Sequence, residues 1–245
     1  MNLVVDSGNT QAKAALFEHD EIIASARSGN NEWTFVFELI RKYNPSFAVI
    51  SDVSDTTSAM AKELKKNMEV LYVNGKTSVP LKMNYSTPET LGPDRLAAAV
   101  YGKKLFPDNN ILVIQTGTCI TYEFVSREGE YSGGAISPGI DMRLKSMNTF
   151  TAKLPLVKKK EIDHLIGNTT NESILSGVIN GCIAEIDGII DQYRKNFSDL
   201  NVVAGGGDIF FFDKKLKNKI FATENLVLRG LNEILKFNNA KLQKY

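Results

Sequence analysis

The chain begins with short apolar runs separated by polar turns, a pattern typical of antiparallel strands. Three such runs, Asn2–Asp6, Lys13–Glu18 and Glu21–Arg27, have the length of strands and are joined by few residues. Helical periodicity follows over Thr34–Tyr43. The compact apolar segment Phe47–Ser51 then predicts a fourth strand. These patterns predict a β-meander that leads into alternating helices and strands.

The alternation continues to about residue 106. Ser54–Asn67 opens with capping residues and predicts a helix, and Glu69–Val73 predicts a strand. A long loop, Asn74–Leu91, separates this strand from a further helix, which starts at Pro93 and ends near Phe106. Proline is favourable in the first turn of a helix. Three strands followed by alternating helix and strand indicate the α/β class.

The opening pattern recurs in the second half. Leu112–Thr118 aligns with Leu3–Asn9 at a constant offset of 109 residues. Each segment is an apolar strand followed by a polar residue, a small hydroxyl residue and a glycine. Strand-like runs follow in the same order, at Thr121–Val125 and Glu130–Ile136. We infer an internal duplication. The predicted domains are residues 1–110 and 111–245.

The remainder of the second half predicts mostly helix. A helix follows Pro138, and residues 155–169 have the composition of a polar linker. A long helical stretch covers about Asn171–Asn196, a strand covers Asn201–Ala204, and an amphipathic helix covers Thr223–Phe237.

Composition and charge narrow the function classes. With 43% hydrophobic and 23% charged residues, the 245-residue chain has an ordinary globular composition. The 29 basic and 28 acidic residues nearly cancel, so charge gives no support for binding to nucleic acid or to an anionic membrane. Cys119 and Cys182 match no metal-ligand or disulfide spacing. No run approaches the roughly 18 consecutive apolar residues of a membrane helix. We therefore expect a soluble cytoplasmic protein.

The turn after the first strand has the composition of a phosphate-binding turn. Gly8 allows backbone N–H groups to approach a ligand, and Lys13 can reach back as a positive charge. Asp6 can hold Mg²⁺ directly or through water. The short donors of this turn are Ser7, Asn9 and Thr10. The same residues also suit a plain polar hairpin. The repeat favours the phosphate interpretation, because two such turns could hold the phosphates of ATP from both sides.

Two further segments admit both a structural and a functional interpretation. In Gly92-Pro93-Asp94-Arg95, the acid and the proline suit the first turn of a helix. Functionally, Asp94 could be a base for a substrate hydroxyl and Arg95 an anion anchor, since phosphoryl transfer needs little more from its base than orientation of the nucleophile. The run 133–139, GGAISPG, could be a tight connection or a close backbone approach to a ligand.

With these segments in order, the chain resembles the type III pantothenate kinases, which open coenzyme A synthesis. That family belongs to the superfamily of acetate and sugar kinases, Hsp70 and actin. The matching motifs occur in the family's order: DxGNT at 6–10, GxDR at 92–95, GTxxT at 117–121, GGxIxPG at 133–139 and a TxxSIxSG-like segment at 170–177. The resemblance implies two duplicated ribonuclease H-like (actin-like ATPase) domains, each with a mixed central sheet, and a cleft between them.

The resemblance also implies an activity and its residues. ATP and Mg²⁺ would be the cofactors, pantothenate the substrate, and Asp94 the base on its terminal hydroxyl. Asp6 would hold Mg²⁺, through water. The implied ATP contacts are Asp6, Ser7, Gly8, Asn9, Thr10, Lys13, Gly117 and Thr118. The implied pantothenate contacts are Tyr85, Gly92, Pro93, Asp94, Arg95 and Thr170. Thr170 would come from the partner subunit of a homodimer, with the site near the subunit interface.

One position departs from the family pattern. The family usually has an aspartate at the start of the second turn, where it is a ligand for an activating K⁺ or NH₄⁺, and here that residue is Gln115. An amide offers a carbonyl oxygen but lacks the negative charge that favours cation capture. We therefore expect weak or absent dependence on a monovalent cation.

Two alternatives stay open at the level of sequence. The repeat alone also fits another small-molecule kinase, or a phosphatase, of the same superfamily. The second alternative is a non-catalytic homologue that acts as a regulatory binding protein. The family includes proteins first described as accessory transcription factors, and Gln115 would fit a site that has lost its activity. Against the latter, Asp6, Asp94, Arg95 and Thr118 are all retained.

Overall fold

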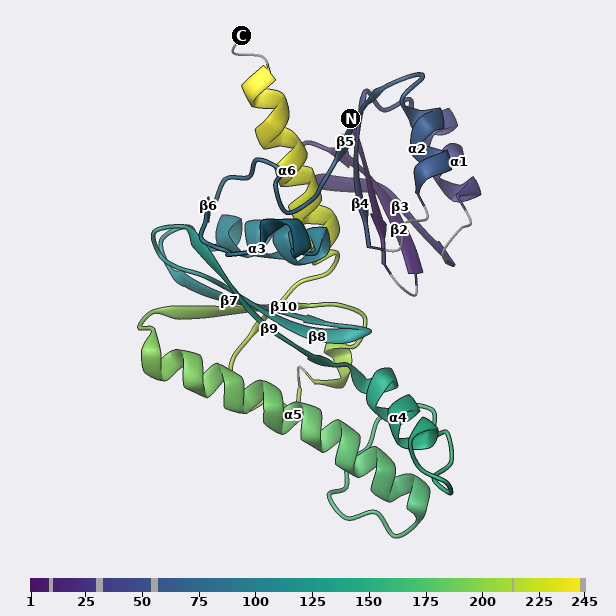
Figure 1. Ribbon diagram of the computed structural model, residues 1–245, viewed down its shortest axis with the longest axis vertical. Helices are drawn as coiled ribbons and strands as arrows, with labels where there is room; N and C mark the ends of the chain where they lie inside the picture. The colour runs from purple at the N-terminus through teal and green to yellow at the C-terminus, as the bar shows by residue number, and fades with distance from the viewer. Residues whose placement is uncertain (9–10, 30–32, 54–56, 213, 243–245) are drawn as a thin grey trace. The chain divides into compact units, whose positions relative to one another are not determined.

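The computed structural model describes residues 1–245 except 9–10, 30–32, 54–56, 213 and 243–245 (Figure 1). The chain packs as two compact units, and each is formed by more than one segment. The first unit consists of Met1–Leu105, Gly129–Ser132 and Asn225–Tyr245. The second consists of Phe106–Glu128 and Gly133–Glu224.

The first unit is built on a five-stranded mixed sheet with the order β3-β2-β1-β4-β5. β1 (Asn2–Ser7) pairs antiparallel with β2 (Gln11–Glu18), which pairs antiparallel with β3 (Glu21–Gly29). On its other side, β1 pairs parallel with β4 (Phe47–Asp52), and β4 pairs parallel with β5 (Glu69–Tyr72). The predicted meander and the fourth and fifth strands are confirmed.

Helices cover both faces of this sheet. α1 (Thr34–Tyr43) and α2 (Ser58–Leu64) pack with the buried side chains of Leu3 and Val5. Because side chains alternate along a strand, Val4 and Asp6 of β1 face the opposite side. There α3 (Pro93–Leu105) and α6 (Leu226–Leu242) lie, and α6 contacts β1, β2 and β4. The buried amide of Asn232 on α6 joins Asn2 at 2.9 Å and the carbonyl of His19 at 2.9 Å.

The second unit is built on a sheet with the order β11-β10-β7-β8-β9-β6. β7 (Asn110–Thr116) pairs antiparallel with β8 (Cys119–Val125) and parallel with β10 (Leu200–Gly205). β10 pairs parallel with β11 (Phe221–Ala222). β9 (Glu130–Pro138) starts in the first unit, where its first two residues pair with β6 (Lys82–Met83).

The strand order confirms the inferred duplication. Read from β9, the second sheet runs β9-β8-β7-β10-β11, and this order repeats β3-β2-β1-β4-β5 of the first sheet. In both halves an antiparallel hairpin is followed by a parallel partner for its first strand. In both hairpin turns the glycine N–H donates forward across the turn at 3.0 Å, although Gly8 bonds to Gln11 O three residues on and Gly117 to Cys119 O two residues on.

The long helix α5 (Thr170–Asn196) is the core helix of the second unit. By length and composition it could cross a membrane, but half of its apolar window is buried. Its buried face, which includes Ile179, Cys182 and Ile186, packs with Leu112 and Ile114 of β7. α4 (Ile140–Thr149) contributes Ile140 and Leu144 to the same cluster.

The sequence did not predict the short strands and 3₁₀ turns. The predicted loop Asn74–Leu91 contains β6 (Lys82–Met83) and the 3₁₀ turn η1 (Pro88–Thr90), and β11 and the 3₁₀ turn η2 (Ile209–Phe211) were also missed. The predicted start of α2 lies outside the described residues. The division into domains 1–110 and 111–245 remains a prediction about the repeat. In packing, α6 joins the first unit, because it lies against α3.

The contact between α3 and α6 requires a glycine. A Cβ at Gly230 would lie 1.9 Å from the carbonyl oxygen of Ala97, whereas a Cβ at Gly188 of α5 would meet open space. We expect Gly230→Ala to lower the free energy of unfolding by about 1–3 kcal/mol through overpacking. Gly188→Ala, the matched control, should raise it by about 0.5–1 kcal/mol through helix propensity. Urea unfolding of both variants measures the difference, and equal shifts would contradict this packing.

Candidate functional site

Asp6 lies at the end of β1, between two polar neighbours in the sheet. Lys13 of β2 is its antiparallel partner, and Ser51 of β4 is its parallel partner. Residues paired directly across adjacent strands share a face, so the three side chains project to the side covered by α3. The hairpin therefore places a lysine beside the aspartate, as the spacing of the turn predicts.

The carboxyl group of Asp6 is short of hydrogen-bond donors. Its Oδ1 and the Ser51 hydroxyl are both buried and have no hydrogen-bond partner within the described part of the chain. Burial, followed by repulsion from Asp94, raises the pKa of Asp6 to about 6, although Ser51 and Lys13 favour the charged form. A buried carboxylate of this kind is stabilised by a proton or by a cation.

Asp94 is placed by the first turn of α3. Its Oδ1 accepts a hydrogen bond from the backbone N–H of Arg95 at 2.9 Å. Burial raises the pKa of Asp94, while the backbone N–H groups of Arg95 and Asp94 and the charge of Arg95 oppose the rise. A Cβ at Gly92 would lie 2.6 Å from Asp94 Oδ1, so glycine leaves room for this carboxylate. The charge of Asp94 also raises the pKa of Asp6, which belongs to the same unit.

Arg95 lies against an aromatic pair. Its guanidinium carbon lies 5.9 Å from the centre of the Tyr85 ring, and that ring lies 6.0 Å from the ring of Tyr131. Tyr131 is fully buried, and its carbonyl accepts the N–H of Asn84 at 3.0 Å. The edge pairing of β6 with β9 therefore fixes the loop of Tyr85, and Tyr85 in turn supports Arg95. Pro93 is buried in the same helix start.

The remaining predicted residues of the first turn are only partly described. Gly8 closes the hairpin through its N–H, as given above. Ser7 follows Asp6 directly on β1, and because side chains alternate along a strand it lies on the opposite face. The residue is fully buried there. Asn9 and Thr10 lie outside the described residues. The structure thus brings Asp6, Lys13, Tyr85 and Gly92–Arg95 into one unit.

The second turn belongs to the second unit. Thr118 is exposed at its tip, and a Cβ at Gly117 would meet open space. Gln115 is half-buried and pairs across the hairpin with Thr121, whose Oγ1 is buried and has no hydrogen-bond partner among the described residues. The turn itself is fixed from the side of α4, because the N–H of Gly139 donates to Thr118 O at 3.0 Å.

Thr170 is the first residue of α5 and is exposed. The preceding residue, Thr169, caps the helix by accepting the N–H of Glu172 at 3.2 Å, and Glu172 reaches back to the N–H of Asn168 at 3.2 Å. This reciprocal capping explains why a TNE sequence begins the helix, and it leaves the Thr170 side chain outside the capping bonds.

Comparison with known proteins identifies the family. The model of the family described as type III pantothenate kinase matches residues 2–192. The type III pantothenate kinase of Christiangramia forsetii is 41% identical over 243 residues, which are 98% of this chain and 100% of that protein. The enzyme of the same name from Bacteroides fragilis strain YCH46 is 43% identical over 243 residues, which are 99% of this chain and 100% of that protein. The chain belongs to the type III pantothenate kinase family.

A solved structure confirms the predicted superfamily fold of this type III pantothenate kinase. The inorganic polyphosphate/ATP-glucomannokinase of Arthrobacter sp. strain KM matches with a TM-score of 0.51 at 15% identity, covering 96% of this chain and 98% of that chain. Identity at this level shows the fold alone. The two mixed sheets with a repeated strand order agree with an actin-like kinase fold.

The first unit could hold Mg²⁺ through Asp6, with most of the other ligands supplied by groups outside the protein. Asp6 offers a buried carboxylate oxygen without a donor, which a hard cation would satisfy. No group of three or more His, Cys, Asp or Glu side chains with the spacing of a metal site occurs in the part of the chain that the structure describes. In kinases, Mg²⁺ is generally held by one or two carboxylates together with substrate phosphates and water.

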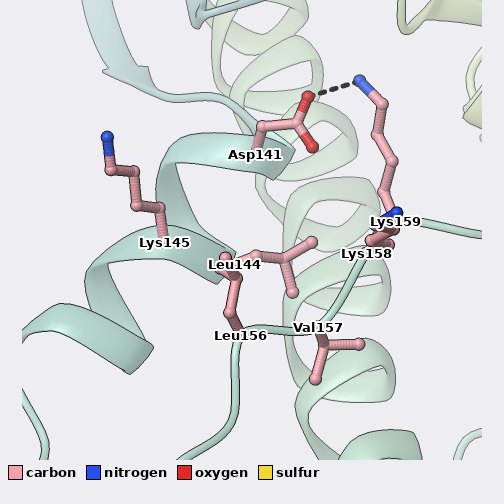
Figure 2. Close-up of a pocket in the computed structure, with 7 residues that line it drawn as sticks. All are labelled: Asp141, Leu144, Lys145, Leu156, Val157, Lys158 and Lys159. Atoms are coloured by element: carbon pink, nitrogen blue, oxygen red, sulfur yellow. Dashed lines mark hydrogen bonds and ion pairs between the residues drawn. The ribbon is translucent and has the colours of Figure 1, made fainter.

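A separate pocket of about 470 Å³ lies wholly in the second unit (Figure 2). Its lining residues are Asp141, Leu144, Lys145, Leu156, Val157, Lys158 and Lys159. Figure 2 shows the Asp141 carboxylate directed at Lys159, at 2.7 Å, and Lys159 also binds the buried Asp208 at 2.7 Å. None of the predicted site residues lines this pocket, so it is distinct from the catalytic residues that family membership implies.

Sequence reasoning missed Ser51 and Tyr131. Ser51 ends the apolar run Phe47–Ser51, and the parallel pairing of that run with the first strand would have placed it beside Asp6. Tyr131 had no signal in the sequence, because its role depends on the short pairing of β6 with β9.

Proposed function

We propose that this protein phosphorylates pantothenate with ATP, giving 4′-phosphopantothenate, the first step of coenzyme A biosynthesis, in the cytoplasm. Membership of the type III pantothenate kinase family supports the substrate and the reaction. The single structural observation that supports the mechanism is the buried Oδ1 of Asp6, which has no hydrogen-bond partner among the described residues and can accept a cation.

Asp94 is the proposed base. Its carboxylate orients the terminal hydroxyl of pantothenate and accepts the hydroxyl proton as the oxygen bonds to the γ-phosphorus of ATP and the bond to ADP breaks. Burial raises the pKa of Asp94, which makes the carboxylate a better proton acceptor than an exposed aspartate. The backbone N–H of Arg95 fixes its orientation.

Arg95 is the proposed anchor for the carboxylate of pantothenate. The cation–π contact with Tyr85 restricts the direction of the guanidinium before substrate binds, so less conformational entropy is lost on binding. Gly92 and Pro93 form the wall beside Asp94.

The two glycine turns are the proposed phosphate sites. Lys13 and the backbone of Gly8 serve the first, and Gly117 and Thr118 the second. Asp6 would hold Mg²⁺ through water. Bound there, Mg²⁺ neutralises charge that develops on the phosphates.

Replacing Asp94 by Asn tests the function and the base together. We expect wild-type protein to convert pantothenate, ATP and Mg²⁺ to phosphopantothenate, detected by mass. Asp94→Asn should lose at least about 100-fold in kcat, while its Kd for ATP by calorimetry changes little. Glu89→Gln, which removes an exposed acid of the same unit, is the control and should keep full activity. Full activity of Asp94→Asn would refute this choice of base.

Gln115 is proposed to make the enzyme independent of K⁺ and NH₄⁺. The side chain opposite it, Thr121, offers only a neutral oxygen. We expect initial rates to be equal with K⁺ and with a tetraalkylammonium salt at fixed ionic strength. Gln115→Asp supplies the missing charge and should acquire activation by K⁺ of several-fold. Strong activation of the wild type by K⁺ would contradict the proposal.

A homodimer is proposed because one end of the second unit exposes many apolar side chains. Phe150 and Ile166 are each 85% exposed and Leu165 is 77% exposed. Ile136, Met142 and Leu156 are exposed as well. They belong to the end of β9, to α4 and to the segment that leads into α5, which lie together in Figure 1. Such clusters mark association surfaces. In such a homodimer, the family resemblance implies that Thr170 contacts the substrate of the partner subunit.

Breaking this surface should separate the subunits. We expect Phe150→Ser combined with Ile166→Ser to give a monomer by light scattering and to raise the KM for pantothenate by at least about tenfold, because the contact of Thr170 is lost. Ile23→Ser, which removes an exposed apolar side chain of the first unit, is the control. A variant that stays dimeric, or a wild type that is monomeric at micromolar concentration, would contradict the interface.

A further inference from the structure

Glu185, in the middle of α5, receives hydrogen bonds from three different elements. The hydroxyl of Tyr122 on β8 donates to its Oε1 at 3.0 Å, and that of Ser137 on β9 donates to the same oxygen at 2.5 Å. The guanidinium of Arg143 on α4 donates to its Oε2 and forms an ion pair with it. One carboxylate thus joins β8, β9 and α4 to the core helix of the second unit.

The network keeps Glu185 charged. Burial by itself raises the pKa of Glu185, but hydrogen bonds from Arg143, Ser137 and Tyr122 outweigh it and lower the pKa below the ordinary value. Burial by itself lowers the pKa of Arg143, but the hydrogen bond to Glu185 outweighs burial, so the pKa of Arg143 lies above its ordinary value and the guanidinium stays charged. A half-buried, fully bonded ion pair fixes the geometry of its members more narrowly than apolar packing does.

The network holds the last two residues of β9 from both sides. Arg143 donates through Nε to the carbonyl of Pro138 at 2.8 Å and lies 3.4 Å from the hydroxyl of Ser137. Ser137 and Pro138 belong to the GGAISPG run, for which the proposed reaction names no contact. Their positions are therefore set by Glu185, directly for Ser137 and through Arg143 for Pro138.

The next residue, Gly139, contacts the second phosphate turn. Its N–H donates to Thr118 O at 3.0 Å, and a Cβ at this position would lie 2.0 Å from Gly117 O and 2.7 Å from Thr118 O. The backbone of Gly139 therefore touches both residues of the turn. A shift of Pro138 would move Gly139 and, with it, the backbone groups of Gly117 and Thr118.

We propose that Glu185 is a positioning residue for nucleotide binding, acting through Ser137, Pro138 and Gly139 on the turn of Gly117 and Thr118. This inference rests on the proposed use of that turn for the phosphates of ATP. It assigns Glu185 no contact with the nucleotide. The substrate residues Asp94 and Arg95 belong to the other unit, so positioning by Glu185 affects ATP and leaves pantothenate binding unchanged.

Glu185→Gln tests the proposal, because it keeps the size of the side chain and removes the charge that orients Arg143. We expect the Kd for ATP, measured by calorimetry, and the KM for ATP each to rise about tenfold, as for loss of a charged hydrogen bond. The KM for pantothenate should stay within twofold. Ser137→Ala should shift the values for ATP in the same direction.

Two control variants separate positioning from stability. Tyr122→Phe removes a buried hydrogen bond to the same oxygen of Glu185, but Tyr122 lies outside the 137–139 segment, so its Kd for ATP should change less than twofold. Asp191→Asn removes another bonded carboxylate of α5, the one paired with Lys217 and Asn218, and should leave ATP binding unchanged. Melting temperatures of all four variants show which of them are destabilised.

The outcomes distinguish this inference from the proposed function. A Glu185→Gln variant that melts earlier but binds ATP within twofold of wild type overturns the inference, because the network would then be structural only. Equal rises in KM for ATP and pantothenate overturn it too. If the wild type binds ATP without forming phosphopantothenate, the proposed function fails, while a tenfold weaker Kd in Glu185→Gln still supports positioning by Glu185.

Discussion

The site proposed in the first unit depends on the position of Asp6 at the end of β1, where one carboxylate oxygen is buried and has no hydrogen-bond donor among the described residues. Asp6 has a buried oxygen without a hydrogen bond, and the charge of Asp94 raises its pKa further. In the absence of a ligand such an arrangement costs free energy, since burying charge without a partner is unfavourable. Under the proposed function, binding of a cation and its phosphates would offset this cost. Lys13 and Ser51 offset only part of it.

The sheet that positions Asp6 could be predicted because its pattern is local. The hairpin of β1 and β2 depends on short apolar runs and a glycine turn, and the same signals recur around Gly117. Pairing across this turn then places Lys13 opposite Asp6 without further information. The duplication adds a constraint, since a second copy of the pattern predicts a second copy of the strand order, and the order is indeed repeated.

Features that depend on contacts between distant residues could not be predicted in this way. β6 has only two residues, and its pairing with β9 exists because their edges meet in the fold. Tyr131 supports Tyr85 for the same reason. In the sequence, Glu185 looks like any polar residue on a long helix. Only the fold brings three hydrogen-bond donors to it, from β8, β9 and α4. Periodicity predicted that the helix exists but not which of its polar residues are bonded inside the unit.

The glycines of the family motifs have a steric explanation that is separate from ligand binding. At Gly139 a side chain would overlap the carbonyl oxygens of Gly117 and Thr118, and at Gly92 it would approach the carboxylate of Asp94. Neither glycine needs to touch a nucleotide or a substrate to be required. Each allows a backbone segment to lie directly against its neighbour, Gly139 against the turn of Gly117 and Thr118 and Gly92 against Asp94. The small residues of these motifs therefore reflect how closely supporting backbone segments approach Asp94 and Thr118, the two polar residues to which the proposed function assigns contacts with substrate and ATP.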